Sequence, residues 1–363
     1  MRKGLAVLVL AGALGCGGET GRTDAGPGPD AGAMTDAGTD AGVDPTGVRW
    51  ESAEPPADGP LRVWGHMVAW LGDGRAVVFG GTNATQVSGV ALDDAWLLDV
   101  RGAAPVFTRL DGSGPSPRYC GCAAWDRGRD VVVVSGGRDV TIPDRIVPET
   151  WELDPATGTW TMMAVSTTPP GRVGCALAYS AARGAVYMFG GASSEIGYSD
   201  RTYRYDPAMP AWTALDAPGP FGRYDAGFAP LGDGSRLVLF AGSAAAMGAA
   251  FYDDTWIFDT STETWTELVA PGDRPPARRV PWIVVDGDRG LWAGLGANGL
   301  LEPLGDLWYL DVAAARWAAV DAGAVTPRGF SPALPAGAGA LGTVLGGWDG
   351  YGPVGDTWRL VRP

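Results

Sequence analysis

The chain of 363 residues contains one histidine, His66, and one lysine, Lys3. A single histidine excludes multi-histidine zinc and copper sites of the usual kinds. Lys3 belongs to an N-terminal segment that we expect to be cleaved, so the mature chain has no lysine for a phosphate-binding P-loop or a Schiff base. No Gly-x-Ser-x-Gly nucleophile elbow occurs either. We therefore expect no cofactor, no metal and no catalysis.

Basic residues are outnumbered: Lys and Arg total 27 against 41 Asp and Glu, a formal charge of −14. Loss of Arg2 and Lys3 on cleavage would change this to 25 against 41, or −16. Such a surface repels nucleic acid and anionic lipid, so we expect neither as a direct partner. Long segments with a helical period are also absent after the N-terminus, which argues against an α-helical fold.

What the chain does have is a unit of about 50 to 56 residues that recurs six times and predicts a repeat architecture. Each unit has an apolar run that ends in glycine: Gly81, Gly137, Gly191, Gly242, Gly296 and Gly347. Each then has an aromatic residue: Trp96, Trp151, Tyr203, Trp256, Trp308 and Trp358. Short apolar runs separated by turn residues predict four strands per unit, which is one blade of an antiparallel propeller.

These glycines and spaced aromatics resemble kelch repeats across essentially all of residues 48–363. The glycine pair is intact at 80–81, 136–137, 190–191 and 346–347, while Ala241 and Leu295 replace its first member. The second glycine is never replaced, which predicts a strand end that needs positive φ or a close backbone approach. The resemblance implies an all-β, six-bladed kelch-type propeller of four-stranded antiparallel blades.

The sixth unit ends at Pro363 directly after its third strand, so one strand is missing. Fourth strands carry Phe107, Trp160, Trp212, Trp265 and Trp317. The one unassigned segment of the same pattern is 48–53, with Trp50 at the aromatic position. We therefore predict that this N-terminal strand completes the last blade and closes the ring, which removes open sheet edges.

Residues 1–15 have a basic start and an apolar stretch too short to span a bilayer, as in an export signal. Ala13 to Cys16 resembles a bacterial lipobox, which implies lipidation of Cys16; an ordinary secreted protein is the alternative. Gly17 follows the cysteine, which implies the outer membrane, at its cell-surface or periplasmic face. Residues 16–47 repeat Asp-Ala-Gly and carry spaced acids, which predicts a disordered tether.

Three cysteines lie in the first strands of neighbouring blades: Cys120, Cys122 and Cys175. A disulfide from Cys175 to one of the other two is one possibility in an exported protein. Buried free thiols are the other, because Cys120 and Cys122 share one strand face while Cys175 has the opposite offset from its arginine. Metal binding is a third, weaker possibility.

Each unit begins near an arginine: Arg62, Arg118, Arg172, Arg223, Arg278 and Arg328. In kelch adaptor proteins the matching arginines lie near one mouth of the channel, and some bind acidic peptides, so the resemblance implies candidate ligand-binding residues. The structural alternative is that each pairs with the acid two residues before the aromatic: Asp94, Glu149, Asp254, Asp306 and Asp356. Arg201 stands at that position in the third unit. His66, four residues after Arg62, is expected to be structural.

The loops between second and third strands differ most and emerge on one face, where recognition residues commonly lie. Tyr198, Trp348 and Tyr351 are candidate ligand-binding residues there, suited to stacking on a sugar or anchoring a peptide, although packing within the loops is equally expected. We expect a lipid-anchored monomer that binds a protein or glycan outside the cytoplasm. The alternative is a carbohydrate-active enzyme resembling the kelch-type sialic acid epimerases.

Overall fold

The computed structural model describes residues 45–56, 59, 62–83, 90–102, 104–139, 141, 145–245, 250–331, 333–335 and 339–362. The predicted signal segment 1–15, Cys16 and residues 16–44 of the predicted tether lie outside this set. No helix of the described residues is long and apolar enough to cross a membrane. The secondary structure of these residues consists of β-strands joined by turns.

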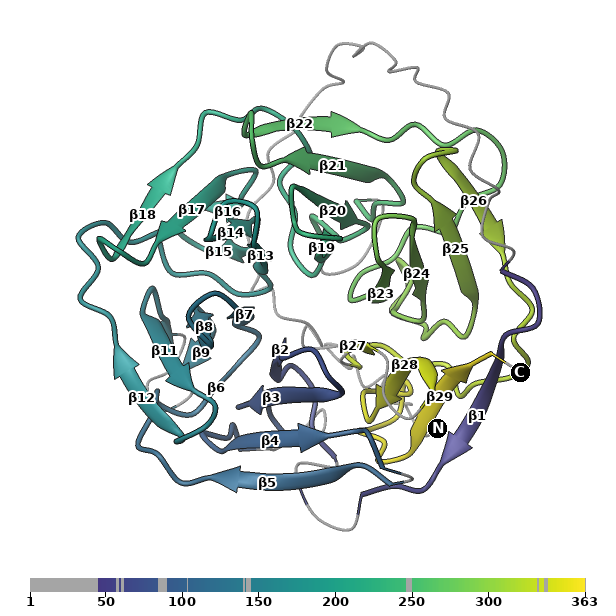
Figure 1. The fold of residues 1–363 in the computed structure, drawn as a ribbon, viewed down its shortest axis with the longest axis horizontal. Helices are drawn as coiled ribbons and strands as arrows, with labels where there is room; N and C mark the ends of the chain where they lie inside the picture. The colour runs from purple at the N-terminus through teal and green to yellow at the C-terminus, as the bar shows by residue number, and fades with distance from the viewer. Residues whose placement is uncertain are drawn as a thin grey trace, which may run out of the picture.

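Within the described residues, six four-stranded antiparallel sheets stand around a ring (Figure 1). The first is β2 (Met67–Trp70), β3 (Arg75–Phe79), β4 (Ala95–Asp99) and β5 (Val106–Leu110). The second is β7 (Cys122–Asp126), β8 (Val131–Ser135), β11 (Thr150–Asp154) and β12 (Thr159–Met162). The third is β13 (Ala176–Ser180), β14 (Ala185–Phe189), β17 (Thr202–Asp206) and β18 (Ala211–Ala214).

The fourth sheet is β19 (Gly227–Leu231), β20 (Arg236–Phe240), β21 (Thr255–Asp259) and β22 (Thr264–Glu267). The fifth is β23 (Trp282–Asp286), β24 (Gly290–Gly294), β25 (Leu307–Asp311) and β26 (Arg316–Ala319). The sixth is β27 (Ala333–Pro335), β28 (Ala340–Leu345), β29 (Thr357–Val361) and β1 (Arg49–Ala53). Short ladders also form between β6 (Arg118–Tyr119), β9 (Arg138–Asp139) and β10 (Arg145–Ile146), and between β15 (Ala192–Ser193) and β16 (Gly197–Tyr198).

The predicted closure of the ring is confirmed, because β1 forms the outer strand of the sixth blade. It pairs antiparallel with β29, with Trp50 opposite Leu360. The Trp50 ring packs against Trp282 of the fifth blade, with 5.3 Å between centroids. The two ends of the propeller body are therefore joined by backbone hydrogen bonds as well as by packing.

The glycine pair that ends each second strand has left-handed backbone at both positions. Gly81 has a φ of 93° and Gly347 one of 103°, as predicted from the second glycine never being replaced. The first position requires positive φ as well, since Ala241 and Leu295 adopt 63° and 52°. A side chain in this conformation is strained, so these two replacements carry a cost that the surrounding blade offsets.

Neighbouring blades are connected by side chains of their outer strands. The indole of Trp212 donates to Thr150 Oγ1 of the preceding blade at 2.9 Å, and Trp265 does the same to Thr202. Glu152 accepts hydrogen bonds from Arg129 of its own blade and from the Tyr205 hydroxyl of the next, at 2.9 Å. These contacts fix the angle between blades and hence the shape of the central channel.

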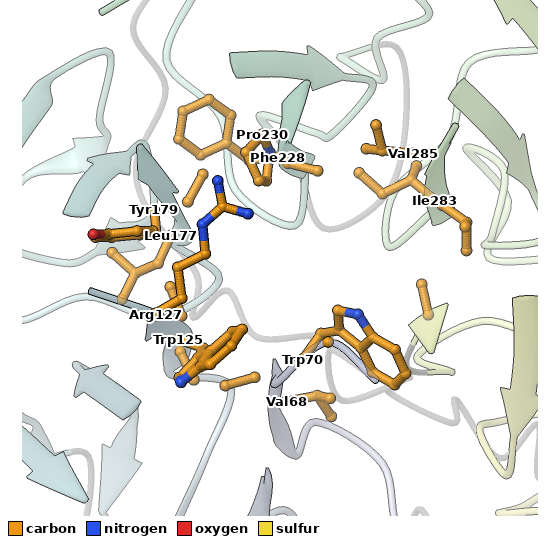
Figure 2. A pocket seen from close by; sticks show the side chains of 18 of the residues that line it. Val68, Trp70, Trp125, Arg127, Leu177, Tyr179, Phe228, Pro230, Ile283 and Val285 are labelled. Atoms are coloured by element: carbon orange, nitrogen blue, oxygen red, sulfur yellow. The ribbon is translucent and has the colours of Figure 1, made fainter. Parts of the chain in front are cut away.

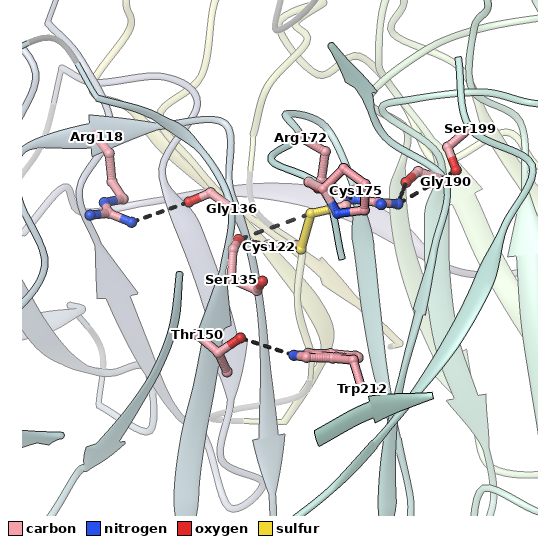
Figure 3. The surroundings of a disulfide bond; sticks show 11 residues. Arg118, Cys122, Ser135, Gly136, Thr150, Arg172, Cys175, Gly190, Ser199 and Trp212 are labelled. Atoms are coloured by element: carbon pink, nitrogen blue, oxygen red, sulfur yellow. Dashed lines mark hydrogen bonds between the residues drawn. A yellow bond between two sulfur atoms is a disulfide. The ribbon is translucent and has the colours of Figure 1, made fainter. Parts of the chain in front are cut away.

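A disulfide also joins the second and third blades (Figure 3). It links Cys122 of β7 to Cys175, just before β13, with 5.6 Å between their Cα atoms. The possibility of buried free thiols is therefore wrong for this pair. The argument from strand faces failed because Cys120 and Gly174 have φ values of 57° and 61°, which interrupt the alternation of side chains along the first strands.

Candidate functional site

The innermost strand of each blade lines a central pocket of about 460 Å³ (Figure 2). Because side chains alternate along a strand, every second residue faces the channel. The deep layer consists of Val68, Ala123, Leu177, Phe228, Ile283 and Ala333. The next layer toward the turns contains Trp70, Trp125, Tyr179, Pro230 and Val285. The side chains of these two layers are thus aliphatic or aromatic.

Beyond the deep layer, the segments that lead into the first strands of neighbouring blades are hydrogen-bonded to one another directly. Backbone amides donate to carbonyls of the preceding blade from Cys120 to Gly65, Gly174 to Cys120, Asp225 to Gly174 and Val280 to Asp225, at 2.6–2.8 Å. Next to these residues an aromatic cluster gathers, including Trp64, Tyr119, Tyr198, Tyr224, Phe330 and Trp348. The exposed lining residues Arg127, Asp233 and Gly287 lie at the opposite end of the pocket, at the turns between first and second strands.

A buried ion pair between the fourth and fifth blades lies beside this cluster. Arg279 Nη2 is 3.2 Å from Asp225 Oδ2, and both side chains are nearly inaccessible. Arg279 also donates to the Tyr224 hydroxyl at 2.9 Å and lies over the rings of Tyr224 and Phe330. Burial raises the pKa of Asp225 to about 6, against the opposing effect of the Arg279 charge.

Charged groups at the pocket are confined to its mouth. Arg127 and Asp233 stand in the turns after β7 and β19, and both are exposed. Tyr179 contributes a hydroxyl-bearing ring to the wall, and burial raises the pKa of that hydroxyl, with the nearby Asp126 acting in the same direction. The described lining residues therefore contain no pair of carboxylates and no histidine.

Five of the six repeat arginines occupy equivalent buried positions, with 0–1% of each residue exposed. Each Nε donates at 3.0 Å to the carbonyl two residues earlier. Four pair with the acid of their own blade: Arg118 with Glu149, Arg223 with Asp254, Arg278 with Asp306 and Arg328 with Asp356. The same four acids accept the indole N–H of the following tryptophan. The structural alternative therefore describes these four blades.

The third blade lacks this acid, and Arg201 at that position points outward with 64% of its side chain exposed. Arg172 instead donates to the Gly190 carbonyl at 2.8 Å and lies over the Tyr203 ring. Burial lowers the pKa of Arg172, and the Tyr203 hydroxyl opposes that shift.

The first blade differs in register, and the prediction that Arg62 is the sixth equivalent arginine is wrong. Trp64 forms an isolated antiparallel β-bridge with Thr82, and Val173 forms the equivalent bridge with Ala192 in the third blade. The residue before this bridge is Arg172 in the third blade and the buried Val63 in the first. Arg62 is exposed, one residue outside the position. Asp94 pairs instead with Arg109 on the outer strand, at 2.6 Å.

The three aromatic candidates of the loop face are in different surroundings. Tyr198 is partly buried and stacks on Tyr224 with 5.5 Å between centroids. Trp348 is 7% exposed and packs edge-on against Trp64 of the first blade. Tyr351 is 93% exposed, so it alone of the three presents its whole ring to solvent. Contact of these residues, and of the arginines, with a ligand stays a prediction.

His66 is partly buried, and burial lowers its pKa to about 4, so the imidazole is neutral at physiological pH. Its side chain contacts the second glycine of the first blade, since a Cβ at Gly81 would meet His66 Cβ at 2.9 Å. Among the described residues no group of three or more His, Cys, Asp and Glu side chains could hold a metal ion. His66 therefore has packing contacts of the kind expected for a structural residue.

The sequence predicted candidate residues among the repeat arginines and the loops, near the channel mouth, but none on the wall of the central pocket. The first-strand segments, such as 67–70 and 122–125, are apolar and each ends in tryptophan, and a strand at the centre of a propeller places alternate residues on the channel wall. The loops between second and third strands were predicted as the recognition site because they vary most from blade to blade. The aromatic cluster at the loop end could not be foreseen, since it combines residues from five different blades.

Comparison with known proteins agrees with this architecture. Residues 162–333 match the family model described as the KLHDC2/KLHL20/DRC7 Kelch-repeats domain. Adagio-like protein 3 of Oryza sativa subsp. japonica is 28% identical over 279 residues, covering 71% of this chain and 42% of that protein. Kelch domain-containing protein 3 of Rattus norvegicus is 26% identical over 259 residues, covering 68% of this chain and 64% of that protein.

The solved structure of YjhT superposes with a TM-score of 0.64 at 16% identity, covering 83% of this chain and 95% of that one. This likeness concerns the fold. The chain is thus an all-β propeller that is similar to kelch-repeat proteins in part of its sequence and in its fold. It spans about two fifths of the length of the adagio-like relative.

Proposed function

We propose that this protein is a non-catalytic binding protein that takes an apolar group of a protein partner into its central pocket. The observation that carries the proposal is the pocket wall of about 460 Å³, formed by aliphatic and aromatic side chains from all six blades. This volume lies within the range of about 300–1,000 Å³ typical of ligand sites. A rigid ring of hydrogen-bonded blades keeps such a pocket open without a ligand, which lowers the cost of binding.

The alternative, a carbohydrate-active enzyme, needs paired acid and base groups where the sugar would lie. Asp233 is the one carboxylate among the described lining residues, and its Oδ1 accepts the backbone N–H of Ser235 at 2.8 Å. Three aromatic rings, Trp70, Trp125 and Tyr179, could stack on a sugar, but few polar groups accompany them. The lining therefore favours binding of an apolar group over sugar chemistry.

The sequence of residues 1–47 supports an exported form of this monomeric binding protein, attached by lipid at Cys16 to the outer membrane. A Cys16→Ser variant should lose incorporation of a labelled fatty acid and appear in the soluble extracytoplasmic fraction. Retention of label by the variant would refute the attachment.

The binding proposal is tested with a photo-crosslinking residue placed at Val285 in the pocket wall, and at exposed Thr266 on β22 as the control. We expect a discrete crosslinked protein from Val285 and none from Thr266. The product should disappear when Ala123→Phe fills the deep layer without unfolding the chain, as judged by thermal melting. A glycan array probed in parallel separates the enzyme alternative: specific sugar binding that Ala123→Phe abolishes would overturn the proposal.

A further inference from the structure

Among the described residues at the mouth of the pocket, Arg127 has the largest side chain. Two residues beyond the aromatic layer, the other described blades carry Gly72, Ala181, Gly232 and Gly287, whereas the second blade carries Arg127. Figure 2 shows the Arg127 side chain extending along one side of the opening, beside Leu177 and Tyr179, toward Phe228 and Pro230. A single cation therefore stands over an apolar pocket that is otherwise open to solvent.

The acids around Arg127 are engaged elsewhere. Asp126 binds Arg129 at 2.7 Å, and Asp130 accepts the indole N–H of Trp125 at 2.9 Å. Asp233 accepts the N–H of Ser235 within its own turn; that hydrogen bond and, least strongly, the charge of Arg127 lower the pKa of its carboxyl. The ion pairs found among the described residues do not include Arg127. Its guanidinium thus remains available to an anion at the pocket mouth.

The pocket is deep enough to separate an apolar body from a charged end. At about 3.3 Å per residue, the four steps from Val68 to Gly72 correspond to roughly 13 Å along the channel. The aromatic rings of Trp70, Trp125 and Tyr179 lie between these levels. A single carboxylate would match the one guanidinium described at the mouth, whereas further negative charges would be repelled by a chain of net charge −14.

We infer that the partner group bound here is an apolar side chain flanked by a single carboxylate, with the carboxylate paired to Arg127. This inference rests on the proposed function and adds the charge of the bound segment. Guanidinium and carboxylate geometries match in two parallel hydrogen bonds, which gives orientation as well as affinity.

The test uses two fluorescent probes that differ in one charged group. Anilinonaphthalene sulfonate has an apolar aromatic body and one anion, and N-phenylnaphthylamine is the same body without the sulfonate. We expect Arg127→Gln to lower the affinity for the sulfonate probe about fivefold, as for a partly solvated ion pair. The affinity for the neutral probe should change less than about twofold. Ala123→Phe should lower the affinity for both probes. A capped Phe-Asp dipeptide should displace the sulfonate better than capped Phe-Asn.

The outcomes separate the two hypotheses. If Ala123→Phe weakens both probes but Arg127→Gln leaves the sulfonate unchanged, the carboxylate inference is wrong and the pocket proposal stands. Equal displacement by the two dipeptides would likewise overturn the inference. If Ala123→Phe leaves both probes bound as before, the pocket is not their site and the proposed function itself fails. Arg127 is exposed, so its substitution should leave thermal melting unchanged, which keeps the comparison valid.

Discussion

Arg223 and Asp254 are joined by two parallel hydrogen bonds inside the fourth blade, one of them 2.8 Å long from Nη2 to Oδ2. The arginine side chain is inaccessible, whereas 19% of the aspartate side chain is exposed. The Trp256 indole donates to the same Oδ2 at 2.8 Å. These contacts tie the entry of the first strand to the start of the third, and an arginine–acid pair with a tryptophan donor recurs in the second, fifth and sixth blades.

Asp254→Asn should destabilise the protein by about 2–4 kcal/mol, because it leaves a buried guanidinium without its countercharge. Chemical denaturation monitored by tryptophan fluorescence measures the change. Asp94→Asn is the matched control at the same repeat position. Its partner Arg109 has 60% of its side chain exposed, so we expect a loss below about 1 kcal/mol. Equal losses at the two positions would contradict the difference in burial.

Closure of the ring should be essential for cooperative unfolding. A chain beginning at Asp58 lacks β1, leaves β29 with an open edge and should no longer melt in one sharp transition. Trp50→Ala should cost about 3–5 kcal/mol through the cavity left beside Trp282. Glu51→Ala on the same strand is exposed and should change little. Unchanged thermal unfolding of the shortened chain would refute closure by β1.

Stability should depend on pH through Asp225. Because folding raises its pKa from 3.8 to about 6, the folded state binds more protons between these values. Its contribution to stability is therefore present below about pH 4 and is lost as pH rises through 6, by up to about 3 kcal/mol. The unfolding free energy of wild type minus that of Asp225→Asn should fall from pH 4 to pH 7. A difference that rises over this range would mean that Arg279 depresses the pKa instead.

The disulfide between Cys122 and Cys175 should stabilise the propeller although the blades already pack together. The cysteines are 53 residues apart in sequence, for which chain entropy predicts about 4 kcal/mol, and the ring contacts should reduce this to about 2–4 kcal/mol. Replacement of both by alanine, measured by urea denaturation, should show that loss. A reductant should destabilise wild type by a similar amount and the double variant far less. Equal stability of wild type and double variant would contradict the prediction.

Much of the fold could be predicted because the same pattern of strands and turns recurs in six units of the sequence. The turns, the glycine conformations and the completion of the last blade by 48–53 all follow from local patterns that recur at a fixed spacing. The arginine pairs were one of two alternatives, and the structure shows them in four blades. The prediction for Arg62 was wrong because the buried position of the repeat is held by the next residue, Val63. No local pattern in the sequence distinguishes a shift of one residue.

The sequence by itself determined the class of the fold, the repeat and the way in which the ring closes, since each rests on periodicity and on short-range backbone requirements. The tertiary structure alone decided which blades exchange contacts at the centre. The pairing of Asp225 with Arg279, the bridge from Cys122 to Cys175 and the place of Arg127 over an apolar pocket all depend on the angle between blades. That angle is fixed by the packing of outer-strand side chains against the next blade, a three-dimensional constraint that no single repeat contains.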